Sequence, residues 1–173
     1  ISFDMDDTLW DFDGVMRRSL GEVLKELDRL DPGAAATLSV DKIIAIRDRV
    51  HDDLRGEVTD LYEIRRRSFV RVLVEAGRPD ETLAARLREV YFEHRSANLT
   101  LFDDVRPALE ALAPRYTLGI VSNGNSYPED FGLEDLIAFS VYPQDHGGIE
   151  KPDPRIFRIA LEQARCSPHE LAH

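Results

Sequence analysis

Hydrophobic residues between positions 14 and 98 recur at three- and four-residue spacing, which is the period of one face of an α-helix. Asp31-Pro32-Gly33 interrupts the first run, and Glu63 follows Asp60 at the spacing of a capping box. No strand pattern breaks this block, so it predicts a four-helix bundle over residues 14–98. The four expected helices begin near Gly14, Ser39, Asp60 and Asp80.

On either side of this block, short apolar runs rich in β-branched residues alternate with amphipathic runs. Such strands, separated by helices, are typical of a parallel sheet that is buried on both faces. We therefore expect an α/β fold, a Rossmann-like parallel sheet flanked by helices, formed by residues 1–13 and 99–173 and carrying the helical block as an insertion. The expected strands are 1–5, 116–121 and 139–142, and the expected helices are 107–112, 133–137 and 154–165.

The composition excludes several classes of protein. With 22 Lys and Arg against 33 Asp and Glu, the formal net charge is −11, which argues against a nucleic-acid partner. The single cysteine, Cys166, excludes an intramolecular disulfide and a cysteine-rich zinc module. No apolar run is long enough for a membrane span and no signal-peptide pattern is present, so we expect a soluble cytoplasmic protein without a membrane partner. The oligomeric state stays open.

Polar side chains stand where the predicted strands end. Asp4 and Asp6 follow the first strand two residues apart, a spacing that directs both carboxylates to one side of an extended chain. Ser122 and Asn123 follow the second strand, and Lys151 lies in a proline-stiffened turn further on. Because ligands bind outside the carboxyl ends of parallel strands, we expect these groups to share one site.

This set of groups suits phosphoryl chemistry. A carboxylate attacks phosphorus when cations neutralise the phosphoryl charge, and a second carboxylic acid protonates the leaving oxygen. A serine hydroxyl and a lysine ammonium would hold the phosphoryl oxygens. Lys151 alone does not offset the negative charge of Asp4, Asp6, Asp7 and a phosphate. We therefore expect Mg²⁺, a hard cation that prefers oxygen ligands.

Three segments resemble the first three motifs of the haloacid dehalogenase superfamily, in the order of that family: Asp4-Met5-Asp6-Asp7-Thr8-Leu9, Val121-Ser122-Asn123 and Lys151-Pro152-Asp153-Pro154. The helical block stands where the family inserts a helical cap. The resemblance extends over essentially the whole chain. It implies a phosphohydrolase whose cap opens and closes, with hinges near Asp13-Gly14 and Asn98-Leu99, and a small phosphorylated metabolite as its substrate.

The resemblance also implies residue roles. Asp4 would be the nucleophile that becomes an aspartyl phosphate, and Asp6 the general acid and base. The Asp4 carboxylate and the Asp6 main-chain carbonyl would bind Mg²⁺. Family members that cleave carbon–halogen bonds lack an acid at the position of Asp6, which favours phosphate-ester hydrolysis. The remaining candidates contact phosphoryl oxygens (Ser122, Lys151) or substrate (Thr8, Asn123).

Two departures from the family pattern leave alternatives open. The fourth motif, a Gly-Asp with a further acid that completes the metal site, is expected from about Leu171-Ala172-His173 onward, where these 173 residues stop. If those acids are absent from the molecule, a non-catalytic phosphate-binding protein is the alternative. A phosphosugar mutase or a dehalogenase of the same superfamily is another. The short segment 125–130 also replaces a longer helix that often follows the second motif.

Four further features have two readings each. Arg65-Arg66-Arg67 reads first as a solvated helix edge and second as a recognition site for an anionic substrate. Asp7 and Thr8 are both suited to capping the turn after the first strand, and Thr8 is the one expected to do so. Trp10 is expected in the core rather than at a substrate mouth. His169 and His173 have the spacing of a metal face, but we interpret them as exposed.

Overall fold

The protein is described by a computed structural model of residues 1–173, which divides into two compact units. One unit, the α/β unit, consists of Ile1–Asp13 and Leu99–His173, and the other, the helical unit, of Gly14–Asn98.

Three short parallel strands form the sheet of the α/β unit: β1 (Ser2–Phe3), β2 (Gly119–Val121) and β3 (Phe139–Val141). Their order is β1-β2-β3, and Gly119 is in register with both Ser2 and Phe139. The main-chain N–H of Ser2 also donates to the carbonyl of Ala172 at 2.8 Å, so the segment near residue 172 lies along the other side of β1. The expected α/β fold with a parallel sheet is confirmed, although each strand is shorter than the apolar run that predicted it.

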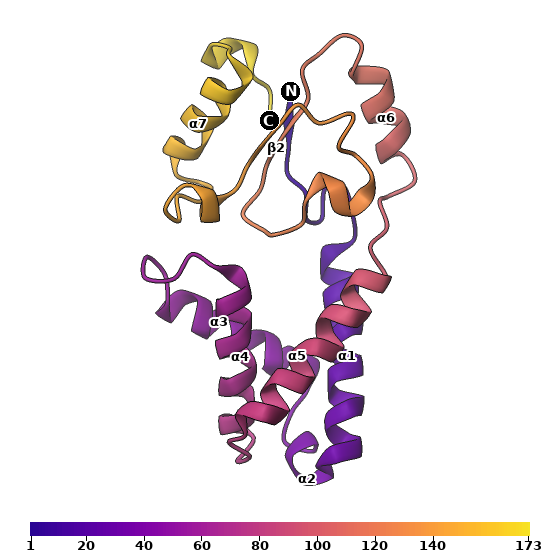
Figure 1. Cartoon of the computed structure of the whole chain (residues 1–173), viewed down its shortest axis with the longest axis vertical. Coiled ribbons are helices and arrows are strands. Elements are labelled where there is room, and N and C mark those ends of the chain that lie inside the picture. The colour runs from indigo at the N-terminus through magenta and orange to yellow at the C-terminus, as the bar shows by residue number, and fades with distance from the viewer. The chain divides into compact units, whose positions relative to one another are not determined.

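Each face of this sheet packs against its own helix (Figure 1). Ile120 belongs to an apolar cluster with α6 (Val105–Leu112), whereas Val121 belongs to a cluster with α7 (Pro154–Ala164). The phenyl ring of Phe139 covers Gly119 so closely that a Cβ there would lie 2.2 Å from the ring. This two-sided burial fixes the carboxyl ends of β1 and β2, where the candidate residues begin.

The helix expected over residues 133–137 is wrong. A one-turn 3₁₀ helix, η1 (Pro128–Phe131), forms just before it and ends at Gly132, which has a left-handed backbone with φ 63°. Residues 133–137 make a turn instead, because only a few residues separate Gly132 from the start of β3. Leu133 is fully buried in the cluster against α6, and this burial explains the apolar pattern that suggested a helix.

Four long helices and one single-turn helix make up the helical unit (Figure 1). The α1 stripe that faces the interior runs from Val15 and Met16 to Leu27, as the hydrophobic spacing predicts. Asp31 caps the single-turn helix, in the loop where the sequence predicted only an interruption. The bounds are α1 (Phe12–Leu30), α2 (Pro32–Ala35), α3 (Val40–Asp53), α4 (Leu61–Glu75) and α5 (Glu81–Ala97).

Side-chain caps explain where these helices begin. Ser39 accepts the N–H of Lys42 at 3.2 Å and Asp80 accepts that of Leu83 at 2.9 Å, as their positions in the sequence predict. The capping box at Asp60 is only half formed. Asp60 accepts the N–H of Tyr62, but Glu63 binds arginines one turn later on α4 instead of returning to the cap.

Polar contacts between helices hold α1 in the helical unit. Glu26 on α1 accepts hydrogen bonds from Arg29 and, across the interface, from Arg86 on α5. The Ser19 hydroxyl lies 2.9 Å from Nδ1 of His94, again joining α1 to α5. No helix of the protein combines the length and apolar character that crossing a bilayer requires.

Candidate active site

Asp4 stands directly after β1, where its carboxylate is held through both oxygens. Oδ1 accepts the main-chain N–H of Met5 at 2.9 Å, and Oδ2 forms a 2.9 Å ion pair with the Lys151 ammonium. The Asp4 side chain keeps 36% of its surface exposed, while that of Lys151 keeps 16%. The carboxylate is thus oriented and charge-paired while one side of it faces solvent, as a nucleophile requires.

Lys151 is positioned by its main chain. The Asn123 side chain donates to the Lys151 carbonyl at 2.9 Å and accepts the Lys151 N–H at 2.7 Å, which fastens the turn to the end of β2. Asp153 then caps α7 by accepting the N–H of Arg155, and the Arg155 guanidinium lowers the pKa of that carboxyl to about 2. The side-chain amide of Asn123, a candidate substrate-binding group, is therefore engaged in placing the lysine.

Ser122 follows β2 and is almost fully buried, at 1% exposure. Its main-chain N–H continues the ladder to Val141 at 3.2 Å, and its hydroxyl oxygen accepts the N–H of Gly124 at the same distance. The hydroxyl hydrogen stays available for an oxyanion acceptor. Ser122 and Asn123 therefore both lie at the end of β2, and Asn123 attaches the turn of Lys151 to that end.

Asp6 is held by side chains that are far apart in the sequence. Its Oδ1 accepts two hydrogen bonds, one from Trp10 Nε1 at 2.9 Å and one from the Ser126 hydroxyl at 2.7 Å. The other oxygen, Oδ2, packs against Gly124, where a Cβ would lie only 2.2 Å away. Asp6 therefore has a defined rotamer, and Gly124 leaves the space that this rotamer needs.

Three residues of this arrangement were not predicted as parts of the site: Ser126, Tyr142 and Gly124. The Tyr142 hydroxyl donates to the Ser126 carbonyl at 2.9 Å, and burial raises the pKa of Tyr142, so the phenol stays a donor. Ser126 itself is fully buried. The only signal in the sequence is that two turn-forming residues, Gly124 and Ser126, follow Ser122-Asn123. By itself this pattern indicates only a loop. Trp10, expected in the core, is fully buried there and also binds Asp6.

Thr8 is exposed in the turn after β1, and its neighbour Asp7 makes the contact that holds the turn. Asp7 adopts a left-handed backbone with φ 57°, and its Oδ1 accepts the N–H of Asp13 at 2.9 Å. The capping role considered for Thr8 thus belongs to Asp7. Thr8 stays a substrate-binding candidate by its position in the motif alone.

His173 lies in the segment beside β1 and contacts both Ser2 and Lys151. Its Nδ1 lies 3.0 Å from the Ser2 hydroxyl, and its Nε2 lies 3.5 Å from Lys151 Nζ. Partial burial and the lysine charge lower the pKa of the imidazole, which therefore favours its neutral form. In that form Nε2 accepts from the ammonium. His169, its partner in the i, i+4 pair, is exposed and binds Ser167 instead.

The donor set can be tested against Mg²⁺. Residues 1–173 contain no cluster of three or more His, Cys, Asp or Glu side chains that is arranged to hold a metal ion. Magnesium is nevertheless often bound by one or two carboxylates together with water and substrate phosphate. The partly exposed Asp4 carboxylate is an oxygen donor of this kind, so the donor set is compatible with a magnesium ion that has an incomplete protein shell. The Asp6 main-chain carbonyl stays the second ligand that the resemblance implies.

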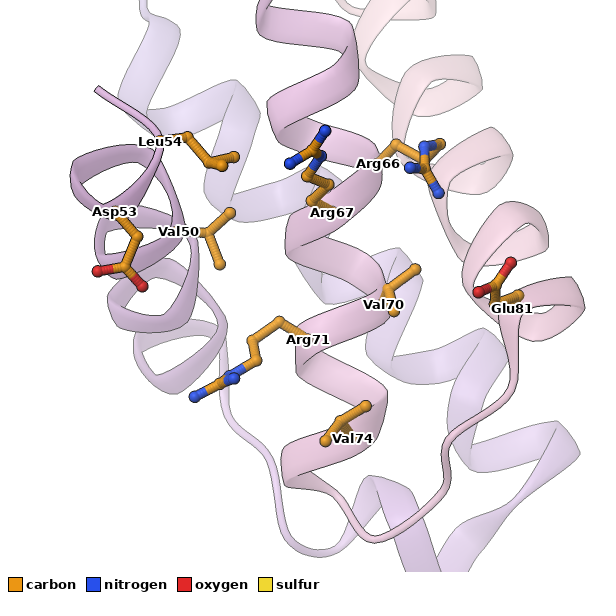
Figure 2. A pocket seen from close by; sticks show the side chains of 9 residues that line it. All are labelled: Val50, Asp53, Leu54, Arg66, Arg67, Val70, Arg71, Val74 and Glu81. Atoms are coloured by element: carbon orange, nitrogen blue, oxygen red, sulfur yellow. The ribbon is translucent and has the colours of Figure 1, made fainter. Parts of the chain in front are cut away.

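The helical unit has an open groove of about 440 Å³ between α3, α4 and α5 (Figure 2). Val50 and Leu54 line it from one side, with Val70 and Val74 on α4. Its arginines are ion-paired inside the unit: Arg66 and Arg67 share Glu63, and Arg71 shares Glu75 with Arg49. Asp53 and Glu81 complete the lining that Figure 2 labels. Two members of the 65–67 run are therefore the solvated, paired edge that was expected.

A family model described as haloacid dehalogenase-like hydrolase matches residues 1–173. A characterised relative is 5-amino-6-(5-phospho-D-ribitylamino)uracil phosphatase YigB of Escherichia coli (strain K12). It is 26% identical over 175 residues, and the match takes in the whole of this chain and 73% of the relative.

Solved structures with the same fold include 2-haloacid dehalogenase from Pseudomonas syringae pv. Tomato DC3000. That structure has a TM-score of 0.73 at 33% identity, covering 95% of this chain and 72% of its own. The HAD-hydrolase YfnB from Bacillus subtilis, bound to magnesium, has a TM-score of 0.71 at 23% identity, covering 99% and 75% of the two chains. The chain is thus similar both to a phosphatase and to a dehalogenase.

Proposed function

Because the chain belongs to the haloacid dehalogenase-like hydrolases, we propose that it hydrolyses the phosphate ester of a small phosphorylated metabolite. The hydrolase family and the YigB relative support this proposal, and the arrangement of Asp6 carries it. An alkoxide leaving group is strongly basic and needs a proton, whereas a halide ion leaves without one. A carboxyl group held two residues after the nucleophile is therefore useful to a phosphatase and serves no purpose in carbon–halogen cleavage.

The proposed first step forms a bond between an Asp4 carboxylate oxygen and phosphorus and breaks the bond between phosphorus and the ester oxygen. The departing oxygen takes the proton of Asp6, which enters the step as a carboxylic acid. The Lys151 ammonium, 2.9 Å from Asp4 Oδ2, stabilises the negative charge that develops on the phosphoryl oxygens, together with the Ser122 hydroxyl.

In the second step, a water molecule attacks phosphorus of the aspartyl phosphate and the bond from phosphorus to Asp4 breaks. Asp6, now a carboxylate, takes the proton of that water, so both carboxyl groups return to their starting states and inorganic phosphate leaves. Asn123 acts through Lys151 in both steps, because it fixes the turn that carries the ammonium.

Mg²⁺ would be held by the Asp4 carboxylate and the Asp6 main-chain carbonyl, and it would add positive charge beside the phosphoryl oxygens. The net charge of −11 makes such neutralisation valuable, because an anionic substrate must approach an acidic protein.

A second candidate function is 2-haloacid dehalogenation, which the 33% identity to a solved dehalogenase favours. Asp4 would then attack carbon and displace halide. Asp6 would have no role in that reaction, which is why we place this candidate second.

The two functions are separated by assaying phosphate release from phosphorylated metabolites with Mg²⁺, and halide release from 2-haloacids, on the same preparation. We expect phosphate release, abolished in Asp4→Asn and unchanged in Asp103→Asn. Asp103 is an exposed aspartate at the start of α6, so it controls for the loss of one negative charge. Halide release without phosphate release would overturn the proposal in favour of the second candidate, and phosphate release by Asp4→Asn at the original rate would remove the nucleophile.

A further inference from the structure

The core of the helical unit ends in a group of arginines. Along α5 the buried stripe runs through Ala84, Leu87 and Tyr91 and then continues with Arg95, which is only 7% exposed. A guanidinium at this position brings a fixed positive charge to the end of the stripe, because arginine stays protonated in proteins. The end of the bundle near residue 95 is therefore chemically different from its apolar middle.

Arg65 on α4 is the central member of this group. Its guanidinium lies over the ring of Tyr91, 4.6 Å from the ring centroid, and its side chain is half-buried. It forms no ion pair, whereas its neighbours Arg66 and Arg67 both bind Glu63. The run 65–67 is thus divided, with one arginine turned to the interior and two paired at the surface.

Two further arginines add their charge. Burial lowers the pKa of Arg65, and the charges of Arg47 and Arg95 lower it further, while Tyr91 and Asp48 act in the opposite direction. Arg47 comes from α3, where it contacts both Asp48 and the sulfur of Met16. Three guanidinium groups from three helices therefore concentrate positive charge at one end of the unit.

The Tyr91 hydroxyl supplies an independent observation. Tyr91 is 1% exposed, and its hydroxyl is buried without a hydrogen-bond partner. A buried hydroxyl without a partner has lost its hydrogen bonds to water and gained none in return, so such a group calls for an explanation, for example a bound ligand. A ligand oxygen would satisfy this donor and balance the guanidinium charge at the same time.

We propose that Arg65, Arg47, Arg95 and Tyr91 form an oxyanion-binding site in the helical unit, one that accepts a phosphate or carboxylate group. Guanidinium groups suit this role because their planar N–H donors match the oxygens of such an anion. All four residues belong to the helical unit, whereas Asp4 and Lys151 belong to the α/β unit, and binding of the oxyanion does not require hydrolysis at Asp4.

The test is a titration of the ¹⁵N-labelled protein with inorganic phosphate at low ionic strength, following the Nε–Hε signal of Arg65. It is carried out in wild type and in Lys151→Met, which removes the ammonium of the α/β unit. We expect the Arg65 signal to shift in a saturable way in both. An unmoved Arg65 signal at saturating phosphate would overturn the proposal.

Variants measure the contribution of each group. Arg65→Met keeps an unbranched apolar chain but removes the guanidinium. We expect it to weaken phosphate binding at this site about 10- to 100-fold, because hydrogen bonds to a charged group are lost. In that variant the binding is followed through the Arg95 Nε–Hε signal. Arg66→Gln, one residue away and paired with Glu63, is the matched control and should bind as wild type does. Equal affinities in Arg65→Met and Arg66→Gln would contradict the site.

Tyr91→Phe distinguishes a binding role from a packing role. Because the hydroxyl has no protein partner, its removal should leave the melting temperature unchanged or raise it, while phosphate affinity falls several-fold. A variant with unchanged affinity would exclude Tyr91 from the site.

A kinetic comparison identifies the source of the oxyanion. If it belongs to the phosphate ester itself, Arg65→Met raises KM for an ester with a second anionic group and leaves KM for p-nitrophenyl phosphate unchanged. If the oxyanion is free phosphate, added phosphate changes the hydrolysis rates of wild type. In Arg65→Met the rates with both esters then stay the same when phosphate is added. Either pattern supports an oxyanion site, and identical kinetics of variant and wild type throughout would refute it.

Discussion

Removing the Ser126 hydroxyl tests whether Asp6 is a proton donor that the protein holds in position. Ser126 is fully buried and donates to Asp6 Oδ1 at 2.7 Å, so Ser126→Ala takes away one of the two hydrogen bonds on that oxygen. The bond from Trp10 Nε1, at 2.9 Å, is left in place. We therefore expect Asp6 to keep its general location and lose its fixed rotamer.

The size of the effect follows from the hydrogen bond. Asp6 enters the first step as a neutral carboxylic acid, and a hydrogen bond between uncharged groups is worth about 0.5–1.5 kcal/mol. The upper value applies because Ser126 is fully buried. This corresponds to about a tenfold fall in kcat for an alkyl phosphate, whose alkoxide needs the proton of Asp6. For a nitrophenyl phosphate, whose leaving group needs little protonation, kcat should stay within about a factor of two.

The assay is steady-state kinetics on a series of phosphate esters that runs from nitrophenols to simple alcohols. Ser68→Ala is the matched control, because Ser68 is also buried and donates a 2.8 Å hydrogen bond, in its case to the Ile64 carbonyl of α4. The control should retain the leaving-group dependence of wild type. An equal loss for all esters in Ser126→Ala would show a general structural effect and refute the positioning of Asp6.

Two further predictions concern stability. Ile120→Ala, at a fully buried position in β2, should lower the free energy of unfolding by about 2–5 kcal/mol in urea titrations, and a loss well below that range would contradict the two-sided packing of the sheet. The hydrogen bonds from Arg29 and then Arg86 lower the pKa of Glu26 to about 2 from an ordinary value of 4.5. A lowered carboxyl pKa stabilises the fold at high pH, so this contribution should be present above about pH 4.5 and lost as the pH falls toward 2. Unfolding midpoints measured across that window should fall less steeply in Glu26→Gln than in wild type, and parallel curves would exclude the interaction.

The local parts of the fold follow from the sequence because their causes are local. Ser39 and Asp80 cap α3 and α5 through main-chain groups three residues away, so position along the chain is sufficient to find them. The turn at residues 133–137 did not follow from its apolar spacing. Its apolar residues pack into the cluster that includes α6, Leu133 fully buried and Leu136 and Ile137 partly buried, and the left-handed Gly132 ends the preceding turn before a helix forms.

The candidate site likewise has contacts that the sequence predicts and contacts that it does not. Asp4 and Lys151 could be expected to meet because parallel strands end at one edge of the sheet, and their 2.9 Å ion pair shows that they do. The bond from Ser126 to Asp6 joins residues 120 positions apart and depends on where the loop after β2 folds back, which no local pattern specifies. The inward turn of Arg65 also depends on its packing over Tyr91, so the sequence alone left both readings of the arginine run open.

The most direct test of the account is to mix the enzyme with substrate, quench with acid within a single turnover, and locate the phosphoryl group by mass spectrometry of the peptides. We predict one phosphoryl group on Asp4 that is absent from Asp4→Asn. With p-nitrophenyl phosphate, whose leaving group needs little protonation, it should be more abundant when Asp6 is replaced by Asn. Complete product formation without any phosphorylated peptide, or a phosphoryl group on a different residue, would contradict the role of Asp4.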